Sequence, residues 1–187
     1  MSNKINYGLS NVYIASVTLD SDNVPTFGTP VAMPGAISLT AEPSGETSTF
    51  YADNTAYWVG TANNGYTGTL TIANVPDFFY TSYLGMTVDD NGNLVERATD
   101  QQAYFVMLFQ GEGDANGVRH AFFYAKATRP STENNTVEES IEPGTMALDF
   151  SAIALPGSGI IKARTTENST NYDTWFTTVS LPTFASE

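Results

Sequence analysis

The stretch AYFVMLFQGEGDANGVRHAFFYAKAT, residues 103–128, carries the strongest structural pattern in the chain. Its first part, 103–110, is almost entirely apolar, which is typical of a strand buried on both faces. Its last part, 118–128, is rich in aromatic residues and predicts a second long strand. The glycine-rich segment 111–117 is expected to form the turn between them. The stretch therefore predicts an antiparallel pair of strands at the centre of the fold.

Alternation of apolar and polar residues with a period of two extends this pattern in both directions. It predicts further strands over 11–19, 36–41, 65–72, 145–153 and 160–166, and a short one near Thr177. In the strand 36–41 we expect Ile37, Leu39 and Ala41 to share one face. An Asn91-Gly92 turn predicts a hairpin between 86–88 and 94–95. The expected core includes Val106, Leu108, Phe122, Leu148 and Phe150.

One helix is predicted over 76–84. Pro76 suits the first turn, Asp77 is favoured there by the helix dipole, and Gly85 suits the position after the last turn. Phe79 and Tyr83 are four residues apart, so both rings are expected to pack on the sheet. A second helical turn near 174–176 is a weaker expectation. With 187 residues, the chain fits a single all-β domain over 1–187 with this one helix.

Composition excludes several kinds of site. The chain has no cysteine, so it has no disulfide, thiolate metal site or cysteine nucleophile. His120 is the only histidine, which rules out a multi-histidine metal site within one chain. No run of residues approaches the roughly 18 apolar residues of a membrane span. We therefore expect no cofactor, no bound metal, no membrane span and no enzymatic activity.

Three weaker patterns have structural interpretations that we prefer. His120 lies within a predicted strand with no serine spaced to act as its nucleophile, so we favour a structural histidine over a general base. Asp89, Asn91 and Asn93 have the first three spacings of a calcium loop, but Leu94 replaces the required glycine, which favours a hairpin turn. A pair of carboxylates could form a glycosidase site, although no pair is singled out by the sequence.

Seven basic and 20 acidic residues give a net charge of −13. A surface this acidic repels phosphate backbones, so the protein is not expected to grip nucleic acid. It could still surround nucleic acid without holding it. Four glutamates fall in a predicted loop over 130–144, which is either a solvated acidic loop or a charged surface facing a partner or DNA: Glu133, Glu138, Glu139 and Glu142.

The segment 42–64 is predicted to be a long loop and is unusual in its aromatic content. Phe50, Tyr51, Tyr57 and Trp58 lie in it among small polar residues. Such aromatics either pack on the parent domain or form a protein–protein contact, in which Tyr and Trp commonly act as anchors. These four residues are our candidates for inter-subunit contacts.

An ordered set of short motifs gives the chain a resemblance to a known family. The motifs are Gly8-Leu9-Ser10-Asn11-Val12-Tyr13, Ala41-Glu42-Pro43, Phe50-Tyr51-Ala52-Asp53-Asn54, Gly65-Tyr66-Thr67-Gly68-Thr69-Leu70, Leu84-Gly85, the turn 90–94, Ala103-Tyr104-Phe105, Lys126-Ala127-Thr128-Arg129-Pro130 and Glu142-Pro143. On these motifs the sequence resembles the major tail protein of long non-contractile-tailed bacteriophages, the subunit of the tail tube. The resemblance weakens beyond residue 160.

The resemblance implies a β-sandwich or partly closed barrel with a flanking helix. It implies that six subunits join their sheets into a ring and that rings stack into a hollow tube, with a long loop reaching the adjacent ring. DNA would pass through the lumen without specific binding, and other tail proteins would be further partners. The protein would be made in the cytoplasm of the host bacterium and reside in the virion. Six chains would carry 6 × −13 = −78 formal charges, which suits a conduit for a polyanion.

Two other classes of protein remain open. One is a carbohydrate-binding β-sandwich, in which Tyr51, Tyr57 and Trp58 would stack on sugar rings. The other is a different phage structural subunit, such as a capsid decoration protein or a tail terminator.

Overall fold

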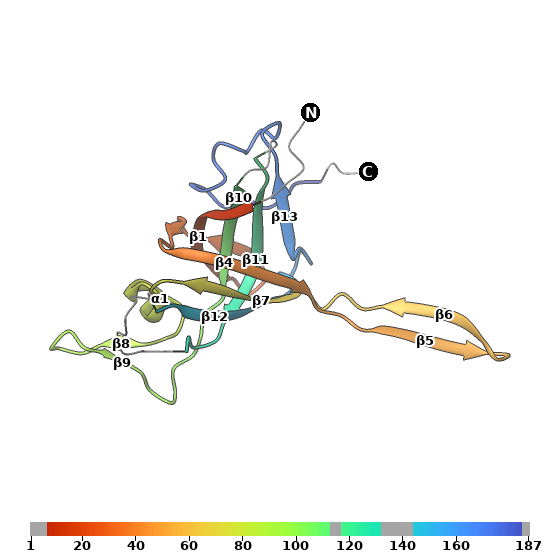
Figure 1. The fold of residues 1–187 in the computed structure, drawn as a ribbon, viewed down its shortest axis with the longest axis horizontal. Helices are drawn as coiled ribbons and strands as arrows, with labels where there is room; N and C mark the ends of the chain where they lie inside the picture. The colour runs from red at the N-terminus through yellow and green to blue at the C-terminus, as the bar shows by residue number, and fades with distance from the viewer. Residues whose placement is uncertain (1–6, 113–116, 132–143, 185–187) are drawn as a thin grey trace, which may run out of the picture.

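The computed structural model describes residues 7–112, 117–131 and 144–184 (Figure 1). The fold is all-β, as the sequence predicted. The helix is α1 (Asp77–Ser82), and the strands are β1 (Tyr7–Leu19), β2 (Pro25–Phe27), β3 (Val31–Ala32), β4 (Ala36–Pro43), β5 (Thr47–Ala52), β6 (Thr55–Thr61), β7 (Tyr66–Ile72), β8 (Thr87–Val88), β9 (Leu94–Val95), β10 (Phe105–Glu112), β11 (Arg119–Ala127), β12 (Met146–Ala152) and β13 (Lys162–Thr165).

Nine of the described strands form one antiparallel sheet. Its hydrogen-bonded order is β2-β1-β10-β11-β12-β7-β4, with β3 beside β1 and β13 beside β11. The sheet curls so that β4 returns close to β1. These two strands are not neighbours in the hydrogen-bonded order, so the curled sheet is an open barrel and not a closed one.

The β10–β11 pair divides the interior into two cores, because its side chains are buried on both faces. Phe105, Met107 and Phe122 point into a core that is shared with β7, β12 and the helix. Val106 and Leu108 point into a second core, which the C-terminal segment covers with Leu155 and Trp175. The predicted burial of 103–110 on both faces is confirmed for residues 105–108, whereas Ala103 is exposed and Phe109 and Gln110 are half-buried. The five predicted core residues are all buried: Val106, Leu108, Phe122, Leu148 and Phe150.

The helix α1 closes one end of the first core. Its Phe79 is fully buried, and the rings of Phe79, Tyr83 and Phe105 lie 5.2–5.5 Å apart, centroid to centroid. Gly85 follows with a φ of +80°, a backbone conformation that favours glycine at a helix end. The helix is shorter than the predicted 76–84, but its position and its buried face are confirmed.

A β-bulge corrects one prediction about β4. The pairing of β4 with β7 shifts register between Ala36 and Ser38, so Ile37 is pushed out of the alternation and is 53 % exposed. Ala36, Leu39 and Ala41 pack against the core instead. The prediction that Ile37 and Leu39 share one face was therefore wrong. Strict period-two alternation does not allow for the extra residue that a bulge inserts into a strand.

The predicted strand near Thr177 is also wrong. This region is a turn, in which the N–H groups of Thr177 and Thr178 both donate to the carbonyl of Thr174, at 3.0 and 2.9 Å. Side-chain packing fixes it, because the ring of Phe176 stacks on Tyr13 at 5.1 Å. The weaker expectation of a helical turn here was closer.

Two predicted loops fall largely outside the described residues. The centre of the turn 111–117 and most of the acidic segment 130–144, with its four glutamates, belong to the undescribed ranges 113–116 and 132–143. Within the described part of the chain, no helix has the length and apolar character needed to cross a membrane.

Candidate functional site

The segment 42–64 forms a β-hairpin, so the predicted loop is wrong. Strands β5 and β6 pair with each other along their whole length, from Thr47 opposite Thr61 to Ala52 opposite Thr55. The two residues between them, Asp53 and Asn54, have φ values of +50° and +60°. Positive φ at both central residues is what a type I′ hairpin turn requires, and Asp and Asn tolerate it. We call residues 47–61 the aromatic hairpin.

This hairpin continues the main sheet outward as a projecting arm (Figure 1). Beyond the ends of β4 and β7, Ser44 and Gly65 stay bridged by an N–H to carbonyl bond of 2.8 Å, and the N–H of Asn64 donates back to Ser44 at 2.8 Å. The N–H of Ala62 then donates to the carbonyl of Glu46 at 2.9 Å. Continuous backbone pairing therefore links the body of the protein to the aromatic hairpin.

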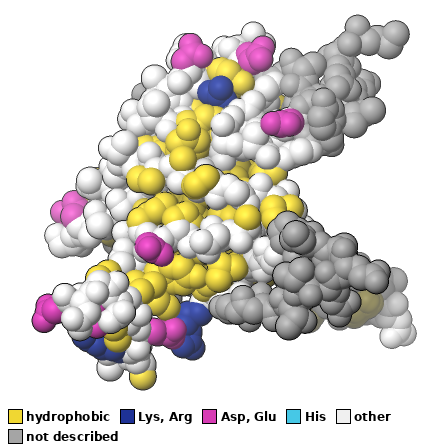
Figure 2. Space-filling view, turned by 60° about the vertical axis from the view of Figure 1, so that its left-hand side comes forward, with side chains coloured by type: hydrophobic (Ala, Val, Ile, Leu, Met, Phe, Trp, Pro, Cys, Tyr) yellow, Lys and Arg dark blue, Asp and Glu magenta, His cyan; other side chains and the backbone are white. Residues whose placement is uncertain are grey.

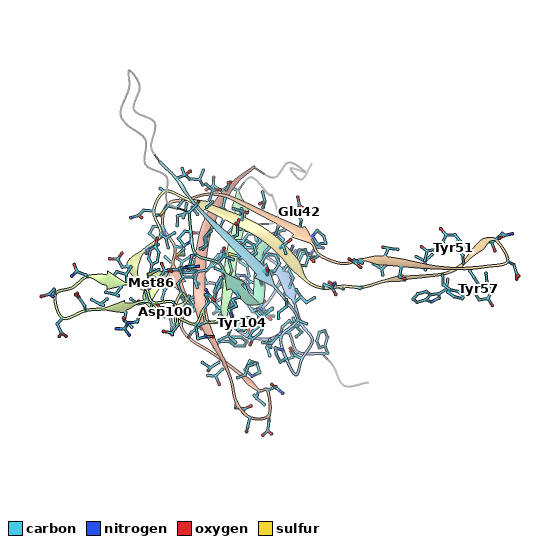
Figure 3. All side chains as sticks on the ribbon, turned by 90° about the horizontal axis from the view of Figure 1, so that it is seen from below. Glu42, Tyr51, Tyr57, Met86, Asp100 and Tyr104 are labelled. Carbon is cyan, nitrogen blue, oxygen red and sulfur yellow. The ribbon has the colours of Figure 1, made fainter. Side chains whose placement is uncertain are left out.

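All four candidate contact residues lie on this arm and face solvent. Phe50 and Tyr51 on β5 are 61 % and 68 % exposed, and Tyr57 and Trp58 on β6 are 76 % and 57 % exposed. None of them belongs to either hydrophobic core. Figure 3 shows side chains standing out on both sides of the hairpin, with the labelled Tyr51 and Tyr57 near its tip. The expectation that these aromatics pack on their own domain is therefore wrong for the single chain.

Two of the four aromatic residues form a cross-strand pair on one face of the hairpin. Phe50 lies directly opposite Trp58 in the β5–β6 register. Trp58 lies over Gly60, where a Cβ atom would come within 2.0 Å of the indole ring. Gly60 thus leaves room for the indole to lie along its own strand. A cross-strand aromatic pair stabilises a hairpin by only about 0.2–1 kcal/mol. More than half of each of these two side chains is exposed and so is free to contact a partner.

The charge of this arm is entirely negative. Between residues 44 and 64, beyond the end of β4, the chain carries two carboxylates and no cation: Glu46 and Asp53. An acidic, aromatic surface favours a partner that offers both apolar area and positive charge.

A second surface, which we call the polar face, covers the outside of β4, β7 and β12. Its register rows run from Thr40 through Thr69 to Asp149, and from Glu42 through Thr67 to Ser151. The hydroxyl of Thr69 donates to a carboxylate oxygen of Asp149 at 2.5 Å. A shallow groove on this face is lined mostly by small hydroxyl-bearing side chains and the two carboxylates.

A third feature, the cationic groove, begins where β11 and β12 end. Gln102, Lys126, Arg129 and Ile153 line it together with Tyr104. The ring of Tyr104 stacks on Tyr124 with centroids 3.8 Å apart, and the ammonium of Lys126 lies 5.1 Å from the centre of the Tyr104 ring. Burial, and then the neighbouring Tyr104, raise the pKa of Tyr124, so its phenol stays neutral at physiological pH. The groove therefore combines an aromatic floor with positive charge.

Sequence reasoning missed the cationic groove because its residues come from three distant segments. The motif Lys126-Ala127-Thr128-Arg129-Pro130 was noted only as part of a resemblance. The aromatic hairpin had a usable signal: the dipeptide Asp53-Asn54 lies between two runs of threonine and aromatic residues, which is a hairpin pattern.

The single histidine is embedded in the fold. Its ring stacks on Phe109 at 5.1 Å, and the carbonyl of His120 accepts a hydrogen bond of 3.4 Å from the indole N–H of Trp175. The calcium-loop spacing at Asp89 forms a hairpin turn, as preferred, in which the carboxylate accepts N–H groups of Asn91 and Asn93 at 2.9 and 2.8 Å. Among the described residues, no group of three or more carboxylate or histidine side chains is placed to hold a metal ion.

Comparison with known proteins adds no family assignment. Neither the family models nor the curated proteins with which the sequence was compared give a match. The features that bear on function are therefore the aromatic hairpin, the polar face and the charge of the chain.

Proposed function

We propose that this protein is the structural subunit of a phage tail tube. Six copies would form a ring, and stacked rings would form a hollow conduit for DNA delivery. The observation that carries the proposal is the aromatic hairpin, a sheet extension that leaves the body and exposes four large aromatic side chains.

Energetics support a role for this hairpin in self-assembly. A two-stranded hairpin that packs on nothing else is only marginally stable in water. Exposed aromatic patches on a soluble chain mark interaction surfaces, and buried Tyr and Trp anchors often contribute about 2 kcal/mol or more each. A partner that covers the hairpin would therefore stabilise it. In an assembly of identical subunits, each copy supplies such a partner to its neighbour.

The polar face supports the second half of the proposal, the conduit. Short Thr and Ser side chains with two carboxylates, Glu42 and Asp149, give a shallow, hydroxyl-rich surface without cations over β4, β7 and β12. Such a wall repels a polyanion and offers it few groups to hold on to. We propose that this face lines the lumen, and that DNA passes it without specific binding.

This function implies a location and further partners. The protein would be synthesised in the host cytoplasm, incorporated into the virion, and contacted by other tail proteins at the two ends of the tube. Its role would be structural and not enzymatic. The net charge of −13 per chain and the aromatic contact surface suit such a subunit.

Negative-stain electron microscopy of the concentrated purified protein, together with a native mass measurement, tests the proposal. We expect hexameric rings or tubes. Single rings that never stack would favour a tail terminator or a capsid decoration protein. A monomer that binds glycans through Tyr51, Tyr57 and Trp58 would favour the carbohydrate-binding class and would contradict the proposal.

A further inference from the structure

The cationic groove has the size of a small-molecule site, and none of the described residues that line it belongs to the aromatic hairpin. It encloses about 400 Å³, and small-molecule sites commonly enclose about 300–1,000 Å³. Lys126 of β11 lies opposite Ser151 of β12, and the N–H of Ile153 donates to the carbonyl of Tyr124 at 3.0 Å. Backbone pairing therefore fixes much of the groove before a ligand enters, which lowers the entropic cost of binding.

An aromatic column holds the ammonium of Lys126 in this groove. The rings of Tyr124 and Tyr104 are nearly parallel, at 8° with centroids 3.8 Å apart, and the ammonium lies 5.1 Å from the centre of the Tyr104 ring. The negative face of an aromatic ring attracts a cation without neutralising it. In the part of the chain that the structure describes, the ion pair found joins Arg129 to Glu96 and leaves Lys126 without a carboxylate partner. Lys126 therefore offers a positioned charge that is still available to a ligand.

The charge around the groove favours an anion. Among the described residues that line it are two cations, Lys126 and Arg129, and no carboxylate. Glu96 offsets Arg129, in line with the Lys or Arg side chains that Figure 2 shows beside Asp or Glu side chains at the end carrying β8 and β9. The neighbouring Asp149 lies on the polar face, where its carboxylate accepts the hydroxyl of Thr69. With a net charge of −13 the chain repels anions at long range, so short-range contacts must hold the ligand.

The other lining groups suit a ligand that has both hydroxyls and an apolar face. Gln102 offers an amide and Thr128 and Ser151 offer hydroxyls, and each of these groups both donates and accepts hydrogen bonds. Ile153 adds an apolar side chain that is 40 % exposed. A phosphate ion would leave the apolar side chain unused, and a fatty acid would leave the amide and the hydroxyls unpaired. A sugar that carries a carboxylate matches the cation, the hydrogen-bonding groups and the apolar side chain together.

We propose that the cationic groove binds a sugar acid, a hexose ring that carries a carboxylate. The carboxylate accepts a hydrogen bond from the ammonium of Lys126. The ring hydroxyls pair with Gln102 and Ser151, and the C–H face of the ring lies on Ile153. The site is contained in one chain, so it goes beyond the proposed tube and does not depend on self-assembly. The sugar is bound without any covalent bond being formed or broken.

Saturation-transfer difference NMR of the full-length protein tests this site, with methyl β-D-glucuronide as the ligand. Methyl β-D-glucoside is the matched neutral sugar, since it differs only in carrying a hydroxymethyl group where the glucuronide carries a carboxylate. The method observes the ligand, so it applies equally to a monomer and to a large assembly. Because a charge-assisted hydrogen bond is available only to the glucuronide, we expect it to bind at least about five-fold more tightly than the glucoside.

Lysine variants assign this preference to the groove. Lys126→Gln removes the charge and should abolish the preference for the glucuronide, while Lys126→Arg keeps the charge and should retain part of it. The matched control is Lys162→Gln, which removes an ammonium that lies 5.1 Å from the centre of the Tyr66 ring and does not line the groove. This control should keep the full preference. Thermal unfolding of each variant checks that it is folded before binding is compared.

The outcomes separate this proposal from the proposed function. Equal binding of the two sugars by the natural protein, or an equal loss in Lys126→Gln and Lys162→Gln, would overturn the groove as a sugar-acid site. Displacement of the glucuronide by an equal concentration of inorganic phosphate or of N-acetylglutamate would show a general anion site and would overturn it too. None of these results bears on rings or tubes. A chain that binds the glucuronide in the groove but stays monomeric would contradict the tube and leave this site standing.

Discussion

Gly68 lies in the middle of β7, between β4 and β12, at a point where a side chain has no room. A Cβ atom built there would come within 2.0 Å of the carbonyl oxygen of Thr40 and 2.9 Å of the Phe150 ring. Gly68→Ala should therefore force two strands apart and lower the free energy of unfolding by about 2–3 kcal/mol. Denaturant unfolding followed by circular dichroism measures this loss.

Gly60→Ala is the matched control. The three atoms nearest to its added methyl group would all belong to the ring of Trp58, which is exposed and can rotate away. We expect the free energy of unfolding of this variant to lie within about 0.5 kcal/mol of that of the natural protein. Equal losses for the two alanine variants would contradict the assignment of Gly68 as a site of close strand approach.

Asp89 is the acid for which the structure predicts a clear pH response. Hydrogen bonds from the side chain and backbone of Asn93, and then from Asn91, lower the pKa of the Asp89 carboxyl. Because the folded-state pKa lies below the unfolded value of about 3.9, the stabilisation of this turn is complete above that value. It should disappear as the pH falls through the lowered pKa.

Titration of the Asp89 carboxyl carbon by NMR checks this prediction. We expect a midpoint below about 3.9 in the natural protein and a higher midpoint in Asn93→Ala, which removes the side-chain donor. The same midpoint in both proteins would show that Asn93 does not set the pKa.

Among the elements, the aromatic hairpin should contribute little to the stability of the body of the protein. Tyr57→Ala/Trp58→Ala removes two exposed rings that touch neither core, so the free energy of unfolding should change by less than about 0.5 kcal/mol. Phe122→Ala, at a fully buried position, should cost about 3–5 kcal/mol as a reference. Thermal unfolding of the three proteins makes the comparison. A large loss in the double variant would mean that these aromatics belong to the core after all.

The strands with the clearest apolar patterns could be predicted from the sequence, because the pattern of apolar residues in them matches the burial of those residues in the fold. The pair β10–β11 is apolar on both faces and is buried on both faces. Strand β12 alternates, and its inward residues Leu148 and Phe150 are buried as expected. The turn at Asn91-Gly92 follows from the conformational preference of its residues.

Departures from alternation could not be predicted. A bulge turns Ile37 outward, and a register shift in the β10–β11 pair places Phe123 and Tyr124 on the same side, although they are consecutive. Bulges depend on how two distant strands match in length, which no local pattern encodes. The cationic groove could not be predicted either, since its lining residues come from segments that are far apart in the sequence.

At the scale of the whole molecule, the charge predicts how the protein meets DNA. A net charge of −13 with only seven cations leaves no basic patch able to neutralise several phosphates. Double-stranded DNA should therefore migrate unchanged in a gel-shift experiment with the natural protein, even at low salt, where electrostatic binding is strongest. A retarded band that disappears as salt is raised would contradict the proposal of a conduit that does not hold its cargo.

Sedimentation velocity of the natural protein and of Tyr57→Ala/Trp58→Ala, over the same range of concentrations, tests whether the aromatic hairpin drives assembly. We expect rings or tubes for the natural chain. For the double variant we expect folded, smaller species, with association weakened roughly 30-fold or more per lost anchor. Identical assembly of the two proteins, or a natural chain that remains monomeric throughout, would contradict the claim that the aromatic hairpin joins copies of this protein into a tube.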